Sequence, residues 1–483
     1  MCSLYLRGMN WKNNSLFLLS VLICSIPIFL TFNRGINYFD EGYMLEGARR
    51  IISREVPYRD FHFVYTPGTI YYLAFFFRIF GQSLIVERIA ASFLSMVGIT
   101  FLGLSVRKMT NNTLLAFLSM ALYAVWGPSH INFVWPVMCV LPLVFIYFYL
   151  LLSSHLLLSG VVMGILLLTK QNFGGALLIS FMCYLVFTGY SKKQLLKISL
   201  GFLSVIAIFI LHLLITQSFI PFISDMNTYT IQEILVRKSF SSPFPTQSIG
   251  KSILYVSPAI LSLIICIGLL VKKASRSLLI IPFTTLALYL FGIFPTPDWT
   301  HLTPLLSIMG LLFVLLPSVF GGRYKILSLI LLFGMVGVGI YSLSTRNYYR
   351  WEAPMMRHIY CFSSGRMKNI CMDEKNHNVI SQTVPLIERE ALHNDSIFAF
   401  YNNPIYYFLT DKNNPTRYID FNVLIGKNEE QRVVSAIQKK NVKIIITRFP
   451  PQNNQSKIIS AFIEKYYSPI KQTYEFTVWK IKN

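Results

Sequence analysis

Long apolar stretches, separated by short polar connections, fill the first two-thirds of the chain. A helix needs about 20 mostly apolar residues to cross a bilayer. We therefore predict a polytopic α-helical membrane protein with about eleven transmembrane helices. Their approximate ranges are residues 15–33, 84–106, 112–127, 133–153, 155–169, 173–190, 195–219, 251–271, 277–294, 302–319 and 325–344.

A further apolar stretch, from Thr66 to Phe80, is interpreted differently. It opens with Pro67 and Gly68, carries Arg78 and is about 15 residues long, which is short for a crossing of about 20 residues. We expect this stretch to form a helix that lies along the membrane surface.

The positions of the basic residues favour that choice. With the N-terminus in the cytoplasm and residues 66–80 outside the count of spans, almost every short basic connection falls on the cytoplasmic side. These connections carry Arg107, Lys108, Lys192, Lys193, Lys197, Lys272, Lys273, Arg276, Arg323 and Lys325. We therefore expect a multi-pass protein of the plasma (inner) membrane, with the first outer loop (residues 34–83) and the C-terminal region outside the cytoplasm.

Composition excludes several other classes of protein. Hydrophobic residues make up 54% of the 483 residues and charged residues only 13%, whereas a soluble globule carries roughly 25% charged residues. The 7 cysteines are too few for a disulfide scaffold. The formal net charge is +22, but no basic run or stacking motif accompanies it, so we expect no nucleic-acid partner.

The C-terminal region is more polar than the rest. Residues 345–483 hold 20 of the 43 basic and 12 of the 21 acidic residues, so a membrane module (1–344) is followed by a region long enough to fold alone. Residues 396–401 and 443–447 resemble buried strands, 474–480 a half-exposed strand, and helices are expected near 429–440 and 455–466. We predict a C-terminal extracytoplasmic α/β domain. Cys361 and Cys371 either form a disulfide there or remain free thiols.

The first outer loop carries most of the candidate chemistry. A helical pattern runs from Asp40 to about Arg54, and Asp40 is placed to cap that helix. A carboxylate at a membrane surface is also a plausible base for an incoming hydroxyl. On the spacing alone, Asp40 is either a helix cap with Glu41 as a solvated neighbour, or a catalytic residue.

The loop resembles the first periplasmic loop of the GT-C membrane glycosyltransferases, in particular protein mannosyltransferases and lipid A aminoarabinose transferases. The resemblance rests on Asp40-Glu-Gly-Tyr43, Ala48, Pro57-Tyr-Arg-Asp-Phe61, Pro67-Gly68, Phe80-Gly81 and Arg88. Two later segments are also similar to this family: Gly160 to Gln171, with Thr169-Lys170, and Pro297 to Pro304, with Asp298 and His301.

The resemblance implies an inverting transfer of a sugar from a polyprenyl-phosphate donor to a lipid, glycan or protein acceptor on the outer face. Asp40 matches the catalytic base, with Glu41 its neighbour. A departing lipid phosphate needs cations around it. Our candidates for binding the donor phosphate are Lys170, His301, Arg59 and Arg88, and those for binding substrate are Asp60, His62, Asp298, Tyr58 and Gln171.

Each candidate has a simpler explanation. Lys170 could extend to the membrane interface, Arg59 and Asp60 could form a surface pair worth under about 1 kcal/mol, and Arg88 could only anchor a span. Asp298, His301 and His62 could be ordinary loop residues. Asp40, Glu41, Asp298 and His301 could hold a divalent metal, but no tight ligand spacing exists, so we assign no metal or cofactor.

A transporter or flippase of lipid-linked saccharides is the alternative function. Such proteins tend to show internal repeats and charged residues at mid-membrane depth. Here the charged residues lie mainly at the ends of the spans, and transport does not explain the long C-terminal region.

Overall fold

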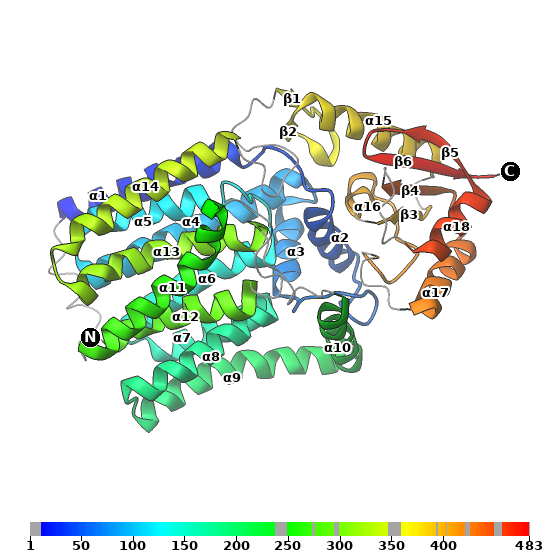
Figure 1. Cartoon of the computed structure of the whole chain (residues 1–483). Coiled ribbons are helices and arrows are strands. Elements are labelled where there is room, and N and C mark those ends of the chain that lie inside the picture. The colour runs from blue at the N-terminus through cyan, green and yellow to red at the C-terminus, as the bar shows by residue number, and fades with distance from the viewer. Residues whose placement is uncertain are drawn as a thin grey trace.

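The computed structural model describes residues 11–236, 249–272, 276–293, 299–345, 359–392, 395–401, 403–419, 421, 426–448 and 456–482. Helices run side by side through most of the chain, and strands occur near its C-terminal end (Figure 1). The helices of the bundle are α1 (Trp11–Thr31), α4 (Leu84–Thr110), α5 (Thr113–Trp126), α6 (Pro136–Leu152), α7 (Leu156–Thr169), α8 (Gln171–Thr188), α9 (Lys192–Ile215), α11 (Ile249–Lys272), α12 (Ile280–Ala287), α13 (Trp299–Phe320) and α14 (Tyr324–Thr345).

The bundle has the character of a membrane protein. Within the described residues, five apolar stretches are long enough to cross a bilayer: Asn14–Thr31, Leu84–Thr110, Gln171–Thr188, Lys192–Ile215 and Tyr324–Thr345. Shorter apolar helices accompany them. On α9, Ile208 and Ile215 are 69% and 72% exposed, which is tolerable where lipid covers them. The prediction of a polytopic helical membrane protein is confirmed, whereas the number of eleven spans stays a prediction.

Glycines allow two of these helices to approach closely. A Cβ atom on Gly160 of α7 would collide with the backbone carbonyl of Ile198 on α9, and one on Gly201 of α9 would collide with that of Leu157. Gly164 continues the same face one turn later, against Val205. Small residues at this spacing are typical of tight helix packing in membranes. The glycine-rich segment at 160–164 is therefore explained by the packing of α7 on α9.

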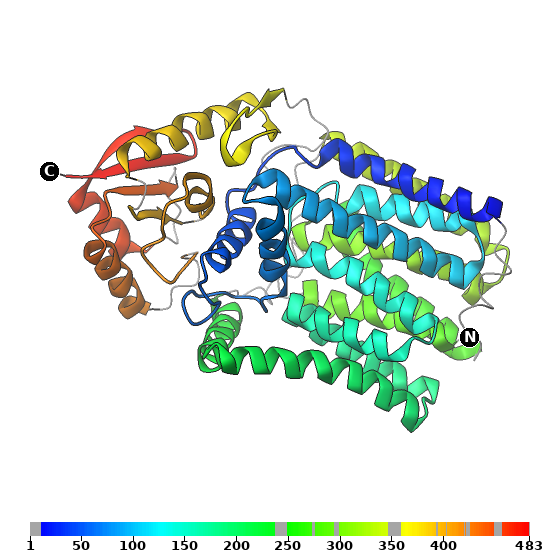
Figure 2. The ribbon, with the colours of Figure 1, turned by 180° about the vertical axis from the view of Figure 1, so that it is seen from behind.

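Two helices form within the 34–83 segment. α2 (Asp40–Ile52) occupies the range for which the sequence predicts a helix, and α3 (Gly68–Phe80) occupies the short apolar stretch. α3 lies across the ends of the bundle helices at a steep angle (Figures 1 and 2). Ile70, Leu73 and Phe77 on one face of α3 are buried. This orientation agrees with a helix along the membrane surface.

The C-terminal region contains the predicted strands and helices. Its elements are β1 (Tyr360–Cys361), β2 (Cys371–Met372), α15 (Glu374–Glu390), β3 (Ile397–Phe400), α16 (Ile405–Thr410), α17 (Gly426–Lys439), β4 (Ile444–Arg448), α18 (Lys457–Tyr466), β5 (Tyr467–Gln472) and β6 (Phe476–Ile481). The larger sheet has the order β3-β4-β6-β5, with β3 and β4 parallel and the other pairs antiparallel. A disulfide joins Cys361 to Cys371 across the β1–β2 pair.

The two faces of this sheet pack against different parts of the chain. Phe398 and Phe400 of β3 point to a core shared with α17 and α18. The alternate residues, Ile397 and Ala399, belong to a second core that continues into the 34–83 segment. Successive strand residues face opposite sides of a sheet, so one face packs on its own helices and the other on the distant loop. The region is long enough to fold alone, but the structure gives it a shared core.

Backbone pairing fastens the 34–83 segment to the C-terminal region. The N–H of Gly35 donates to Cys371 at 2.9 Å, and the N–H of His62 donates to Arg417 at 2.8 Å. Gly42 of α2 touches the backbone of Ile405 at the start of α16, where an added Cβ would lie 2.5 Å from the nitrogen. The segment therefore lies between the bundle and the C-terminal sheet (Figure 2).

Candidate active site

Asn37 caps the start of helix α2. Its Oδ1 accepts the backbone N–H groups of Phe39 at 3.0 Å and of Asp40 at 2.8 Å. Asp40 is the first helical residue, and the residue at the cap position, Phe39, makes no side-chain cap. The expectation that Asp40 caps the helix is wrong, because Asp40 is already the first residue with helical hydrogen bonding and the cap position precedes it. Capping therefore does not account for the half-buried carboxylate of Asp40.

Glu41, the next residue, lies in a different environment. It is fully buried, its Oε1 forms an ion pair with Arg88 of α4, and its Oε2 accepts the N–H of Asn37 at 2.8 Å. A carboxylate so placed is held by protein groups on both oxygens. The two adjacent acidic residues of α2 thus differ in their environment: Asp40 is half-buried, whereas Glu41 is enclosed by protein groups.

Arg88 is enclosed together with Glu41. Besides the ion pair, it donates to the Gly35 carbonyl at 3.1 Å and to Oδ1 of Asn132, and its Nε lies 3.5 Å from Glu87. Its side chain has no exposed surface. Asn132 in turn donates to the Phe32 carbonyl at 2.8 Å. This network joins the end of α1, the start of α2 and the start of α4.

Lys170 is buried at the break between α7 and α8. The residue is 4% exposed, and its Nζ lies 5.7, 5.4 and 4.8 Å from the ring centroids of Tyr65, Trp135 and Phe173. Cations within about 6 Å of an aromatic centroid are attracted to the ring face. The ammonium group is therefore held among three rings and away from open water, which contradicts the alternative that it merely extends to the interface.

Gln171 and its neighbours join this break to the 34–83 segment. The Gln171 side chain accepts from the Thr66 N–H at 3.1 Å and donates to the Val64 carbonyl at 2.9 Å. The Thr66 hydroxyl donates to Leu167 at 2.8 Å. A Cβ on Gly68 would lie 2.6 Å from the Leu168 carbonyl, so only glycine fits against the end of α7. Two of the similar segments noted in the sequence therefore meet.

Aromatic side chains connect Asp40 with Lys170. Tyr43 lies one turn after Asp40 on the same face of α2, and its hydroxyl accepts the N–H of Val64 at 3.1 Å. The ring centroids of Tyr43 and Tyr65 are 6.5 Å apart, and Tyr65 borders the Lys170 amine. Tyr43, one turn from the candidate base, and the buried cation thus contact the same ring, that of Tyr65.

Arg59, Asp60 and Tyr58 lie together at a turn. Arg59 is on the surface and forms two hydrogen bonds to Asp60, at 3.0 and 2.8 Å. These hydrogen bonds, with that from the Val56 N–H, outweigh partial burial and lower the pKa of Asp60. Tyr58 is buried, and its hydroxyl donates to the Tyr65 carbonyl at 2.6 Å. Arg59 and Asp60 form the surface pair that the sequence allowed, while Tyr58 supports Tyr65.

His62 is buried against the C-terminal region. Its residue is 3% exposed, and its ring lies 5.5 Å from that of Tyr418 between centroids. Burial, with Arg417 nearby, lowers its pKa to about 3, so the imidazole is neutral. Asp298 lies outside the described residues, and so does the side chain of His301, which is on the first turn of α13.

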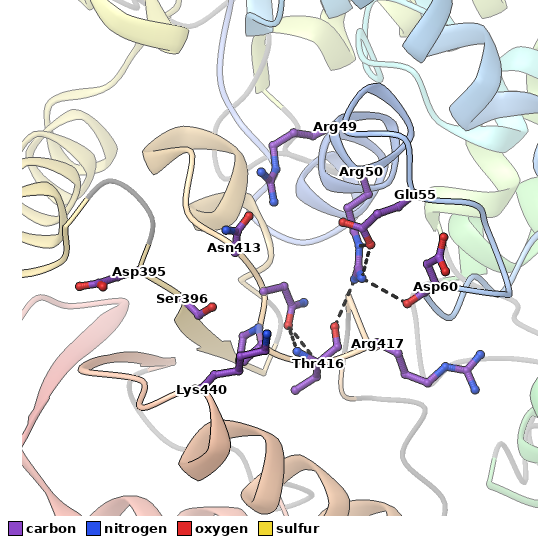
Figure 3. A pocket seen from close by; sticks show the side chains of 12 residues that line it. Arg49, Arg50, Glu55, Asp60, Asp395, Ser396, Asn413, Thr416, Arg417 and Lys440 are labelled. Carbon is purple, nitrogen blue, oxygen red and sulfur yellow. Dashed lines mark hydrogen bonds and ion pairs between the residues drawn. The ribbon is translucent and has the colours of Figure 1, made fainter.

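Two pockets open where the 34–83 segment meets the C-terminal region. Figure 3 shows the first, about 520 Å³, in which Arg50 points to Glu55, to the Asp60 carbonyl and to the Thr416 carbonyl. The second, about 540 Å³, contains His62 and Arg417. Neither includes Asp40 or Lys170. Within the described residues, no group of three metal-ligating side chains is present.

Several residues at these places were not singled out from the sequence. Tyr65, Trp135 and Phe173 surround Lys170, and Asp225 on α10 (Phe219–Val236) accepts from Arg417 at 3.0 and 3.1 Å. A lone acid in the apolar stretch that begins α10 was a usable signal for Asp225. The aromatic residues gave none, because rings are frequent throughout this chain.

The fold is similar to that of solved membrane glycosyltransferases. ArnT from Cupriavidus metallidurans bound to undecaprenyl phosphate aligns with a TM-score of 0.60 and 12% identity, over 96% of this chain and 97% of that one. The same ArnT in its apo state aligns with a TM-score of 0.56 and 12% identity, over the same shares of both chains.

A larger enzyme shares the arrangement in part. The arabinofuranosyltransferase AftD from Mycobacteria aligns with a TM-score of 0.50 and 9% identity, over 97% of this chain and 40% of that one. No protein-family model and no curated protein matches the sequence. At these identities the likeness establishes the fold. The chain has the fold of the GT-C membrane glycosyltransferases, as the resemblance of its first loop indicated.

Proposed function

We propose that this protein is an inverting glycosyltransferase that moves a sugar from a polyprenyl-phosphate donor to an acceptor hydroxyl. The observation that carries the proposal is the placement of Lys170, a cation buried among three aromatic rings at the break between α7 and α8, against the loop that presents Asp40. The full-length likeness to an ArnT bound to undecaprenyl phosphate supports a lipid-phosphate donor.

The proposed step is a single displacement. Asp40 takes the proton of the acceptor hydroxyl, whose oxygen attacks the anomeric carbon from the face opposite the phosphate. The bond between that carbon and the phosphate oxygen breaks, and the polyprenyl phosphate leaves with the electron pair. Lys170 stabilises the charge that grows on the leaving phosphate, in a setting where aromatic walls exclude water. One displacement inverts the anomeric configuration.

The remaining candidates receive separate proposals. Glu41 and Arg88 position the start of α2, because each is enclosed by protein groups. Gln171 positions the segment that carries Tyr65. Asp298 and His301 stay proposed contacts of the donor, on the resemblance of their segment alone. Arg59, Asp60 and Tyr58 belong to the turn that supports the loop.

The proposed location is the outer face of the plasma (inner) membrane. The disulfide between Cys361 and Cys371 is the kind of bond that persists in oxidising compartments. The 34–83 segment pairs with Cys371, so both belong on one side. The basic connections between spans place that side opposite the cytoplasm. We propose a membrane module over residues 1–344 and an extracytoplasmic domain over residues 345–483.

The test uses membranes that contain the full chain and radiolabelled polyprenyl-phosphate sugars. Asp40→Asn removes the base at constant size and is expected to lower transfer by about 10²-fold or more. Glu55→Gln is the matched control, since it removes one charge from the same segment while Arg50 keeps its hydrogen bonds to the Asp60 and Thr416 carbonyls. Unchanged transfer by Asp40→Asn would refute the assigned base. Movement of the saccharide without a new glycosidic bond would favour a transporter.

A further inference from the structure

The second pocket is built from four separate parts of the chain. Residues from the 34–83 segment, α10, the 415–418 stretch and α17 line it, and its volume of about 540 Å³ lies within the range of small-molecule sites. The lining residues are His62, Ser224, Asp225, Thr228, Pro415, Thr416, Arg417, Tyr418, Glu429, Arg432, Val433 and Ala436.

The charges of this pocket are paired. Arg417 contacts both oxygens of Asp225, at 3.0 and 3.1 Å, and Arg432 contacts Glu429 at 2.5 Å. The Tyr418 hydroxyl donates to the second oxygen of Glu429 at 2.5 Å. Two acids thus balance two bases, which offers no excess positive charge for a phosphate or a carboxylate. The pocket suits an uncharged ligand that is rich in hydrogen-bonding groups.

One buried polar atom in the pocket lacks a partner. Nε2 of His62 has no hydrogen bond among the described residues, although the residue is 3% exposed. An unsatisfied buried polar group is costly, and a native structure holds few of them. The ring is neutral because burial lowers its pKa to about 3. A neutral imidazole nitrogen pairs well with a hydroxyl group, which either donates or accepts.

We propose that this pocket binds an uncharged saccharide, which, if the proposed transferase function holds, is part of the acceptor. The hydroxyl groups of such a ligand would pair with His62 and with the remaining lone pairs of Asp225 and Glu429. The ring of Tyr418, beside His62, offers a flat apolar face for a sugar ring.

The position of the pocket connects it with the proposed active site. Phe63, the residue after His62, stacks on Tyr43 with centroids 5.3 Å apart, and Tyr43 lies one turn from Asp40. A saccharide held at His62 therefore lies next to the aromatic packing that includes Tyr43, one turn from the proposed base. This continuity makes an acceptor a better assignment than the lipid-linked donor, whose phosphate we place at Lys170.

The experiment measures binding without donor or turnover. The full chain in detergent is applied to a printed array of uncharged and acidic glycans. Ala436→Phe fills the pocket from a half-buried position on α17, and His62→Phe removes the unpaired nitrogen at similar bulk. Ser435→Phe adds the same ring at the neighbouring exposed position and is the control. Asp40→Asn, which lies outside the pocket, separates this inference from the proposed function.

Wild type, Ser435→Phe and Asp40→Asn are expected to retain a common set of uncharged glycans, and Ala436→Phe and His62→Phe to bind them about tenfold more weakly or not at all. Thermal unfolding of each variant confirms that it is folded. Three results would overturn the inference. The protein could bind only acidic glycans, it could bind uncharged glycans equally well in both pocket variants, or it could bind no glycan on the array. This experiment does not measure transfer activity. The proposed transferase function can therefore be refuted while saccharide binding is observed, and saccharide binding can be refuted while transfer is observed.

Discussion

Replacing Glu41 should lower the free energy of unfolding, but it should remove no group that takes part in the proposed transfer reaction. Glu41 and Arg88 are both fully buried and paired, and removal of one partner from a buried pair costs about 3–5 kcal/mol. In Glu41→Gln, an amide oxygen can still accept from Arg88, and the Glu87 carboxyl group remains 3.5 Å from Nε. We therefore expect a loss near the lower limit, about 3 kcal/mol.

Arg88→Met should cost more than Glu41→Gln. It leaves Glu41 and Glu87 facing each other without the cation, and it deprives Asn132 and the Gly35 carbonyl of their donor. The expected loss is near the upper limit, about 5 kcal/mol. Asp40→Asn is isosteric and half-buried, so its cost should be about 1 kcal/mol or less.

Unfolding can be followed by labelling cysteines with a thiol-reactive dye during heating. Cys24, Cys139 and Cys266 are buried, whereas Cys183 is exposed and would be replaced by serine in every variant. The reasoning predicts that Glu41→Gln lowers the unfolding midpoint and that Asp40→Asn lowers transfer. If Glu41→Gln abolished transfer at an unchanged midpoint, Glu41 would have a chemical role and our positional assignment would be refuted.

Three further predictions concern Lys170, a glycine contact and a buried histidine. Lys170→Met keeps the apolar stem among the rings but removes the charge, and should lower kcat for transfer by about 10²-fold; activity equal to that of wild type would remove Lys170 from the site. Gly68→Ala must displace the Leu168 carbonyl, 2.6 Å from the added Cβ, and should lower both stability and transfer, while Gly175→Ala, with open space around it, should change neither. His62 has its pKa lowered by burial to about 3 from 6.5, so the unfolded chain binds more protons between these values. The contribution of the neutral His62 to the free energy of unfolding is therefore fully present above about pH 6.5. Below that pH it falls by up to about 1.4 kcal/mol per pH unit. The midpoint of His62→Phe should depend less on pH between about 6.5 and 5, and an unchanged pH dependence would contradict a neutral buried imidazole.

The sequence predicted those features that depend on local pattern. The helix that begins at Asp40, the short apolar helix ending at Phe80 and the strand around Phe398 follow from periodicity and length, which a window of residues carries by itself. The resemblance of the first loop correctly indicated the fold. The cap of α2 was missed, because Asn37 accepts the N–H groups of Phe39 and Asp40 ahead of the helix, and its side-chain direction is not visible in the spacing.

The features that escaped prediction are contacts between distant residues. Arg417 pairs with Asp225 across 192 positions, and Lys170 meets Tyr65 only because the Pro67–Gly68 turn packs on the end of α7. The sequence predicted Arg88 as a cation that binds the donor phosphate. In the structure it is buried and paired with Glu41 and Asn132. Such pairs follow from tertiary packing, which periodicity does not encode.

The core shared by the 34–83 segment and the C-terminal sheet sets an order of events during biosynthesis. The ribosome makes the segment early, yet the strands that share its apolar core are made more than 300 residues later. Until Ile397, Ile444 and Val478 have emerged, the helix that begins at Asp40 lacks its cover on that side. A chain that stops before these strands therefore leaves the apolar side of the 34–83 segment without its partner in the core.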